Sequence, residues 1–255
     1  LAKAFWPGPM TMIFQKSDLV PYGTTGGLDT VAVRMPSHPV ARAVIKAAGT
    51  PIAAPSANTS GRPSPTKASH VVEDMDGKID MIVDGGEVGI GLESTIIDVS
   101  EDTPTILRTW YITKEMLEQV IGGVALDRAS LGQMAPGVHP KAPGMKYRHY
   151  APKAELTIYR GSVPAAARAI NEALRAAAAE GKRAGVICTE ESAGLYEAPV
   201  KKIIGTRTQP ETSAHNLYDV LRAFDEEAVD CIFSESFDDS PLSGAIMNRL
   251  TKAAG

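Results

Sequence analysis

The chain has 255 residues, of which 44% are hydrophobic and 22% charged, and its formal net charge is -4. This composition is typical of a globular protein with one large domain or two modest ones, and it argues against a disordered chain. The acidic balance argues against a broad surface that coats nucleic acid. The two cysteines lie far apart in apolar runs, which favours buried thiols in the reducing cytoplasm over a disulfide.

Short strands alternate with helices in the first part of the sequence. The runs Met10–Phe14 and Thr30–Met35 are rich in β-forming residues and bounded by proline and glycine, so each predicts a strand. Residues 37–49 predict a helix, which Ser37 can cap and Gly49 can end.

The alternation continues up to residue 122. Residues 51–61 predict a strand of small residues that runs into a polar loop, and Ser64–Met75 predicts a short helix. Three further strands are predicted at Ile79–Gly86, Ser94–Ser100 and Pro104–Tyr111. A helix that Thr113 can cap then ends near Gly122. The first part therefore has the pattern of an α/β domain.

Periodicity disappears between Ala125 and Pro152, where glycine, proline and histidine accumulate. A connection of this length without regular structure is usually functional or disordered. Strand–helix alternation then restarts and predicts a small parallel, Rossmann-like sheet. One of its helices is amphipathic, with an apolar face made of Leu217, Val220, Leu221 and Phe224. We therefore expect a first domain over residues 1–122, a linker over 123–153 and a second domain over 154–255.

Common catalytic motifs are absent from the sequence. It contains no H-E-x-x-H, no paired C-x-x-C and no G-x-S-x-G. The stretch Gly86–Ser94 has two glycines at the spacing of a phosphate loop, but Leu92-Glu93 replaces the required Lys-Ser/Thr. The second domain has no G-x-G-x-x-G after its first strand, so its Rossmann-like pattern does not imply a dinucleotide.

Small polar residues collect where two predicted strands end or begin. In "PSANTSG", Ser56 and Asn58 offer hydroxyl and amide groups, and Gly61 lets a ligand approach the backbone. In "GLESTIID", Ser94 stands at a strand mouth, where open α/β sheets bind ligands. An ordinary Asn/Ser turn is the alternative interpretation of the first loop.

Two arginines lie at strand ends near these loops. Arg34 ends one predicted strand and Arg108 ends another. A lone arginine is usually solvated, but two guanidinium groups beside serine and asparagine loops suit a carboxylate and a phosphate.

These stretches, taken in order, resemble a known family. "PGPMT", "TVAVRMPSHP", "PIAAPSANTSGRPSPT", "VDGG" with "ESTIID", and "ILR" are similar to the YrdC-like domain of threonylcarbamoyl-AMP synthases. The linker "APGMKYRHYAP" and the terminal "AIMNRL" resemble the two-domain form. The resemblance implies a YrdC-like twisted mixed-sheet α/β domain, incomplete at its N-terminus, followed by a smaller Rossmann-like α/β domain.

The resemblance also implies a reaction and a site. Family members are nucleotidyltransferases that join L-threonine, bicarbonate and ATP into threonylcarbamoyl-AMP and release pyrophosphate, for threonylcarbamoyladenosine modification of tRNA. By similarity, Arg34, Ser56 and Ser94 bind threonine. Thr30, Asn58, Thr66 and Arg108 contact the nucleotide, and Mg²⁺ accompanies ATP. No covalent or acid–base residue is implied, and no protein ligand for a metal is assigned.

The linker carries further expected nucleotide contacts. By the same resemblance, Tyr147, Arg148 and His149 lie near ATP, and residues 141–152 fold over the site as a lid. Two features depart from the family pattern. The basic Lys-x-Arg motif of the family's N-terminal segment has no counterpart, because the sequence starts downstream of it. Residues 109–111, Thr-Trp-Tyr, replace the Pro-Gly that usually follows the arginine.

Other functions stay open at this level. One alternative is an RNA- or nucleotide-binding YrdC-like module without catalysis, although the acidic charge and the 5% aromatic content count against RNA. Carbamoyl transfer in hydrogenase maturation uses a related domain. A protein with that function would also have acylphosphatase and zinc-finger segments, which this sequence lacks. The oligomeric state, and the partner in tRNA modification that receives the adenylate, do not follow from the sequence.

Overall fold

The computed structural model describes residues 1–127, 150–237 and 243–255. Two compact units are present, and each is described by itself. The first unit contains Leu1–Pro55 and the described residues from Glu93 onward to residue 127. The second unit contains Ser56–Leu92 and the described residues from Tyr150 to the end of the chain.

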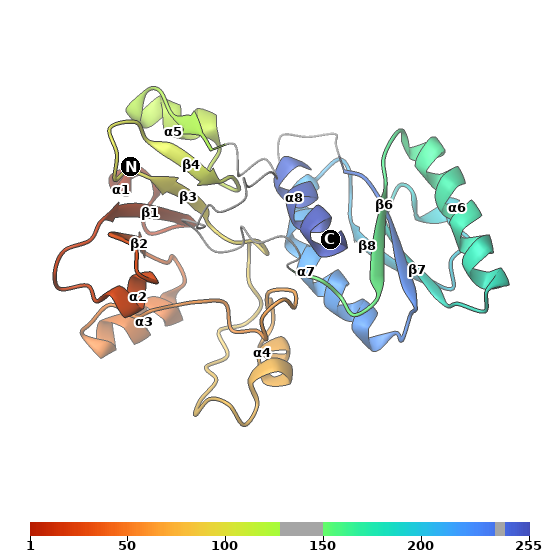
Figure 1. The fold of residues 1–255 in the computed structure, drawn as a ribbon, viewed down its shortest axis with the longest axis horizontal. Helices are drawn as coiled ribbons and strands as arrows, with labels where there is room; N and C mark the ends of the chain where they lie inside the picture. The colour runs from red at the N-terminus through yellow and green to blue at the C-terminus, as the bar shows by residue number, and fades with distance from the viewer. Residues whose placement is uncertain (128–149, 238–242) are drawn as a thin grey trace. The chain divides into compact units, whose positions relative to one another are not determined.

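A mixed five-stranded sheet forms the first unit, and Figure 1 shows its strands in red to green. The strands are β1 (Met10–Gln15), β2 (Thr30–Arg34), β3 (Thr95–Asp98), β4 (Thr105–Arg108) and β5 (Ala125–Leu126). Their order is β2-β1-β3-β4-β5, in which β1 and β3 are parallel and β3 and β4 antiparallel. The four helices described in this unit are α1 (Ala2–Phe5), α2 (Tyr22–Thr25), α3 (Pro39–Ala48) and α5 (Lys114–Ile121).

The core of the first unit lies between the central strands and α5. Alternate residues of β1 and β3 point into it, as period-2 patterning requires. Its buried members are Met10, Met12, Ile97, Ile106, Ile112, Leu117 and Val124. The side chain of Thr113 accepts a hydrogen bond from the Met116 N–H at 3.3 Å, so the predicted cap of α5 is confirmed.

The start of α3 differs from the prediction by one residue. His38, not Ser37, is the N-cap, and its side chain makes no capping hydrogen bond. The reason is Pro39 at the first helical position, which holds the preceding residue in an extended conformation and needs no N–H partner. Gly49 ends the helix with φ of 64°, as expected.

Two predicted strands are absent from the described structure. Neither residues 51–61 nor residues 79–86 pair with another strand. In the first segment, Pro51 and Pro55 have no N–H to give to a ladder. In the second, apolar side chains such as Met81 and Val83 are 77% and 58% exposed, so no packing supports a strand.

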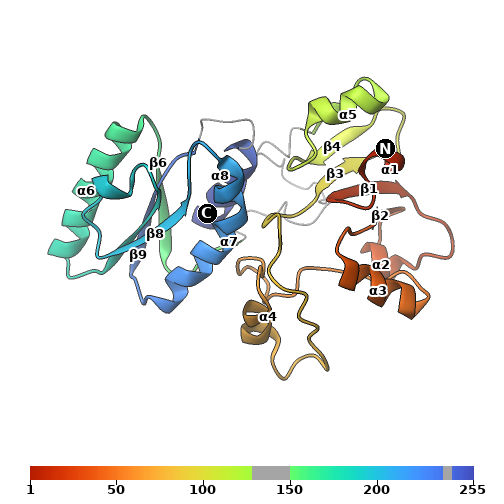
Figure 2. The ribbon, with the colours of Figure 1, turned by 180° about the vertical axis from the view of Figure 1, so that it is seen from behind.

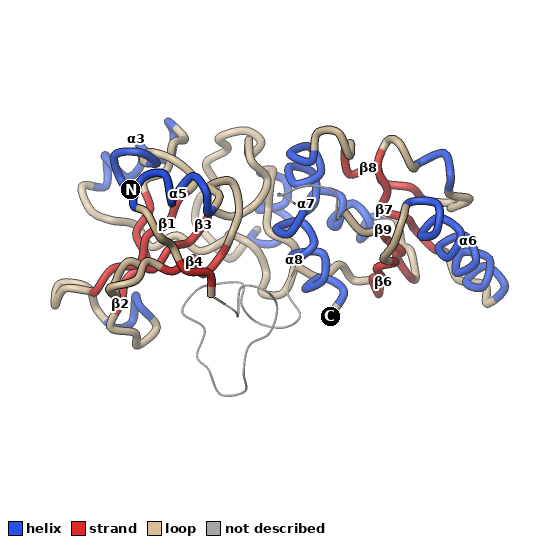
Figure 3. The backbone as a smooth tube through the Cα atoms, turned by 90° about the horizontal axis from the view of Figure 1, so that it is seen from above, coloured by secondary structure: helices blue, strands red, loops and turns tan. Residues whose placement is uncertain are grey.

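A parallel four-stranded sheet forms the centre of the second unit, in the order β6-β9-β7-β8. Its strands are β6 (Glu155–Tyr159), β7 (Ala184–Thr189), β8 (Val200–Gly205) and β9 (Cys231–Glu235). The helices of this unit are α4 (Ala68–Met75), α6 (Val163–Ala179), α7 (Pro210–Glu226) and α8 (Ser243–Ala254), with a 3₁₀ turn, η2 (Ala193–Leu195). Helix α6 covers one face of the sheet, and α7 and α8 cover the other (Figures 2 and 3).

Helix α7 packs closely on the sheet. The four residues of its predicted apolar face are buried, which confirms that prediction. Gly185 on β7 allows the close approach, because a Cβ atom at this residue would lie 2.3 Å from the ring of Phe224. The Rossmann-like α/β fold expected for this part of the chain is therefore present. None of the described helices is both long enough and apolar enough to span a bilayer.

Candidate functional site

Ser94 is the centre of a polar cluster at one end of the first sheet. It directly precedes β3, and the parallel register, with Met10 opposite Thr95, brings Thr11 of β1 beside it. The two hydroxyl oxygens are 2.7 Å apart, and both side chains are buried. A buried hydroxyl pair of this kind needs further partners to satisfy its lone pairs.

Two arginines supply those partners from the neighbouring strands. Arg34 Nη1 donates to Ser94 Oγ at 3.3 Å, and Arg108 Nη2 donates to the same oxygen at 3.4 Å. Arg108 Nε also donates to the Ser94 carbonyl at 2.9 Å. Because these two donors use both lone pairs of the hydroxyl, the Ser94 proton is assigned to the hydrogen bond with Thr11.

The register of the sheet explains this convergence. Arg34 lies opposite Thr11 in the β1–β2 ladder, and Arg108 lies opposite Ile96 in the β3–β4 ladder. Both guanidinium groups therefore reach Ser94 from strands on either side of the β1–β3 pair. Arg34 is exposed and Arg108 half-buried. Two such cations beside one hydroxyl suit an anionic ligand with carboxylate or phosphate oxygens.

The turn after Arg108 is held by a residue that sequence reasoning missed. Thr95 is fully buried; its hydroxyl donates to the Ile112 carbonyl at 3.0 Å and accepts from the Ile112 N–H at 3.2 Å. Trp110 is buried within this turn. Although Thr-Trp-Tyr stands in place of Pro-Gly, the turn leaves Arg108 directed at Ser94.

Thr30 does not join this cluster. It lies opposite Gln15 at the other end of β2, four residues from Arg34. At about 3.3 Å per residue, this separation is roughly 13 Å along the strand. Its expected contact with the nucleotide stays a prediction.

The remaining predicted loop residues belong to the second unit. Ser56 is exposed. Asn58 Nδ2 donates to the Thr59 and Arg62 carbonyls at 3.0 and 3.2 Å, so this side chain shapes its own loop. Thr66 is buried, and its N–H donates to His70 Nδ1 at 3.2 Å. Tyr147, Arg148 and His149, with the predicted lid, lie outside the described residues.

Buried charges in the second unit were not predicted. Burial alone would raise the pKa of Asp74, but hydrogen bonds from Arg222 and the Thr59 N–H hold it below its usual value of 3.8. The two partners of the Asp74–Arg222 pair are 148 residues apart in sequence. No local pattern signals a contact of that range, because Asp219 and Asp225, one turn before and after Arg222, give this side of α7 the composition of a solvated face.

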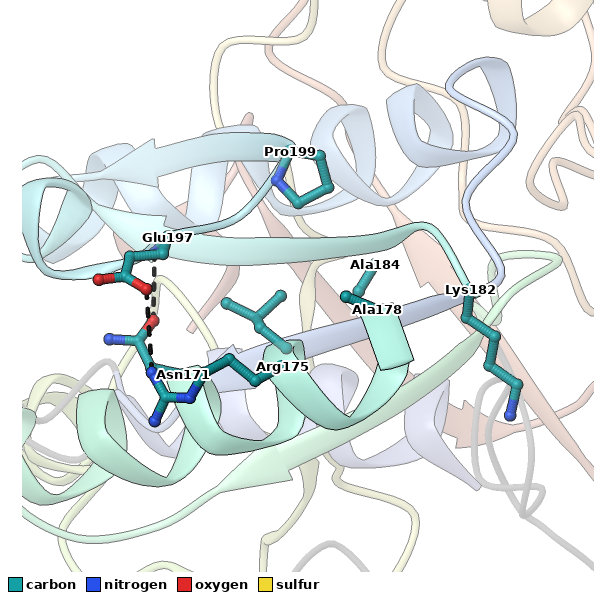
Figure 4. A pocket seen from close by; sticks show the side chains of 8 residues that line it. Asn171, Arg175, Ala178, Lys182, Ala184, Glu197 and Pro199 are labelled. Carbon is teal, nitrogen blue, oxygen red and sulfur yellow. Dashed lines mark hydrogen bonds and ion pairs between the residues drawn. The ribbon is translucent and has the colours of Figure 1, made fainter. Parts of the chain in front are cut away.

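A small pocket also opens beneath α6, with a volume of about 120 Å³ (Figure 4). Asn171 on α6 donates to the Leu195 carbonyl at 2.8 Å and accepts from the Glu197 N–H at 3.1 Å, which holds the loop at its rim. The pocket lies on the opposite face of the sheet from α7 and contains none of the predicted site residues. It is therefore not a candidate for the substrate site.

Comparisons with known proteins match both parts of the chain. The model of the Sua5, YciO and YrdC family, described as telomere recombination, matches residues 1–109. The model described as the C-terminal domain of threonylcarbamoyl-AMP synthase matches residues 112–255. The chain belongs to the threonylcarbamoyl-AMP synthase family. Its membership in the two-domain form follows, because both models match one chain.

Several members of this family match the whole chain. Threonylcarbamoyl-AMP synthase from Bacillus subtilis is 52% identical over 100% of this chain and 72% of its own length. The synthase from Pyrococcus abyssi is 48% identical over 100% of this chain and 73% of its own length.

Two solved structures of P. abyssi Sua5 share the fold. A doubly substituted variant gives a TM-score of 0.91 at 46% identity, covering 100% of this chain and 71% of that chain. Sua5 in complex with L-threonine gives a TM-score of 0.89 at 45% identity, covering 99% of this chain and 72% of that chain. The predicted two-domain α/β architecture is thereby confirmed.

Proposed function

We propose that this protein synthesises L-threonylcarbamoyladenylate from L-threonine, bicarbonate and ATP, releases pyrophosphate, and supplies the product for threonylcarbamoyladenosine modification of tRNA. The observation that carries the proposal is the convergence of Arg34 and Arg108 on Ser94. Membership in the synthase family, and the L-threonine complex of a relative 45% identical, support it.

The reaction needs two substrates held close together. Bicarbonate adds to the threonine amine with loss of water, which gives a carbamate. A carbamate oxygen then attacks the α-phosphorus of ATP, and the bond from that phosphorus to the bridging oxygen breaks as pyrophosphate leaves. Positioning and stabilisation of negative charge can supply much of the rate for such a step, so a covalent nucleophile is not required.

Each residue of the Ser94 cluster has a role in this proposal. Arg34 binds the threonine carboxylate, as a guanidinium fork suits two carboxylate oxygens. Ser94 orients Arg34, and it hydrogen-bonds threonine, together with Ser56, once the carboxylate has drawn one arginine donor away from the Ser94 hydroxyl. Arg108 stabilises charge on the phosphates, with Thr30, Asn58 and Thr66 as further nucleotide contacts.

Mg²⁺ is proposed as the companion of ATP. No group of three or more His, Cys, Asp or Glu side chains suited to an ion gathers among the described residues. An Mg²⁺ ion bound mainly to phosphate oxygens and water would not need such a group. No step of the proposed reaction is assigned to the ion.

Pyrophosphate release by the full-length protein tests the proposal. Release is expected only when ATP, L-threonine and bicarbonate are all present, and omission of each one in turn is the control. Release without threonine, or no release with all three, would contradict the proposed activity. ATP binding without turnover would instead favour the alternative of a binding module.

A further inference from the structure

Residues 56–92 contain little regular structure of their own. Helix α4 is the only helix or strand described in this segment. With so few backbone hydrogen bonds inside it, the shape of the segment depends on contacts with neighbouring elements. This matters because Ser56, Asn58 and Thr66, which the proposed function assigns to the substrates, all lie in this segment.

Asp74, at the end of α4, is the point where several parts of the segment meet. It is 2% exposed. Its Oδ2 atom accepts from the Thr59 N–H at 3.0 Å and from Arg222 Nη2 at 2.8 Å, and Arg62 Nη1 contacts its Oδ1 atom. A carboxylate this deeply buried is tolerated only with such partners. Asp74 therefore connects the loop after Ser56 to α4, as long as Arg62 and Arg222 compensate its buried charge.

Arg222 brings the opposing charge from α7 of the parallel-sheet domain. It is 3% exposed. Its Nε and Nη2 atoms donate to the Pro63 carbonyl at 3.1 and 2.7 Å, and its Nη1 atom donates to Glu73 Oε2 at 3.2 Å. One guanidinium group thus holds the loop at Pro63 and the helix at Asp74. The rigid fork of arginine suits this task better than the single ammonium of lysine.

Other contacts also hold residues 56–92 against α7. Asp225, three residues after Arg222, lies 3.2 Å from Arg62 Nη2. At the far end, Gly91 has φ of 83°, and a Cβ atom there would lie 2.4 Å from the backbone of His215 on α7. His215 Nδ1 lies 3.2 Å from the Gly89 carbonyl oxygen. The segment therefore rests on α7 at both ends, and Arg222 supplies the buried charge between them.

We propose that Arg222 is a positioning residue: through Asp74 and Pro63, it holds residues 56–66 in the conformation that binds substrate. The role rests on the proposed function, because Ser56, Asn58 and Thr66 are substrate contacts only in that reaction. In this role, the parallel-sheet domain contributes to the reaction by positioning a substrate-binding segment and does not need to bind a ligand itself.

The test compares Arg222→Met with Lys202→Met in the full-length protein. Lys202 on β8 forms a 2.6 Å ion pair with Glu227 that touches no residue of the segment, so its loss is the matched control. Amide hydrogen exchange of residues 56–66 is expected to quicken at least tenfold in Arg222→Met and to stay within twofold in Lys202→Met. Peptides from β9 should stay protected in both variants, which shows that the domain is folded.

Kinetics provide the second readout. Arg222→Met is expected to raise the KM for threonine or ATP about tenfold with a smaller change in kcat, whereas partial unfolding would lower kcat at constant KM. The proposal is overturned if Arg222→Met is folded and residues 56–66 exchange at the wild-type rate. It is also overturned if the KM values for threonine and ATP are unchanged. If the wild-type protein releases no pyrophosphate, the proposed function fails, and the exchange measurement still decides whether Arg222 holds the loop.

A substitution at a buried charge can prevent folding. If β9 loses protection in Arg222→Met, Arg222→Lys takes its place, because lysine keeps the charge near Asp74 but cannot make the paired hydrogen bonds to Pro63. Faster exchange of residues 56–66 in Arg222→Lys supports the proposal, and wild-type exchange overturns it.

Discussion

Replacement of Ser94 by alanine is the sharpest test of the polar cluster in the first unit. The substitution removes the hydroxyl that accepts from Arg34 and Arg108 and that donates to Thr11. Thr11 is buried, so its hydroxyl loses a partner that water does not readily replace. The Arg108 contact with the Ser94 carbonyl survives, because it uses the main chain.

The magnitude follows from these contacts. A hydrogen bond to a charged group contributes about 1.5–3 kcal/mol, and the exposure of Arg34 reduces its share. We expect L-threonine binding to weaken by about 1–2 kcal/mol, which is roughly 5- to 30-fold. Separately, the unpaired Thr11 hydroxyl should lower the free energy of unfolding by about 1–2 kcal/mol.

Isothermal titration with L-threonine and urea unfolding measure the two effects. Ser100→Ala is the matched control, because Ser100 also flanks β3 but its hydroxyl donates to Asp98 at 2.5 Å, away from the arginines. Its threonine affinity should stay within twofold of wild type. Threonine affinity within twofold of wild type in Ser94→Ala would refute the assignment of this cluster to the substrate.

Further predictions concern Arg108, Trp110 and His70. Arg108→Ala should weaken ATP binding measured by titration, and an unchanged ATP affinity removes Arg108 from the site. Trp110 Nε1 is buried with no hydrogen-bond partner among the described residues, so Trp110→Phe should change the unfolding free energy in urea by less than about 1 kcal/mol, against about 3–5 kcal/mol for Trp110→Ala. The pKa of His70 lies below its usual 6.5, because burial and then the charge of Arg222 oppose protonation. The unfolded state therefore binds the proton more readily than the folded state. The contribution of neutral His70 to the free energy of unfolding is fully present above pH 6.5 and is lost as the pH drops through the folded-state pKa. Across this pH range, the urea midpoint of unfolding should fall less in His70→Gln than in the wild type. If both midpoints fall equally with pH, His70 is not the source of the pH dependence.

The cluster around Ser94 could be predicted in part from the sequence. Apolar strands that end in serine or arginine place polar groups at the edge of a sheet, and that pattern is local. The register that sets Thr11 and Ile96 opposite the two arginines is not local, because it depends on which strands become neighbours. The sequence therefore predicted the residue types at this edge, whereas only the structure showed that Thr11 lies beside Ser94 and that both arginines reach it.

The failures have a common physical cause. Residues 79–86 have the apolar content of a strand, but a strand also needs a partner that binds its N–H and carbonyl groups. Likewise, Arg222 and Asp74 pair across 148 residues, and periodicity within either helix gives no sign of the partner. Short-range patterns thus predicted elements well and long-range pairing poorly.

The carboxyl edge of the parallel sheet illustrates why the second domain is assigned a positioning role. Parallel sheets commonly bind ligands at this edge, yet here Glu235, at the end of β9, is fully buried in it. One of its oxygens accepts from the Thr189 N–H at 3.0 Å and Ser192 Oγ at 2.7 Å. The other accepts from the Tyr196 hydroxyl at 2.8 Å and lies 3.3 Å from Arg207 Nη2. Because the protein's own groups already occupy both oxygens, this carboxylate has little capacity for a ligand, and the contacts of α7 with residues 56–92 are the better-supported link from this domain to the reaction.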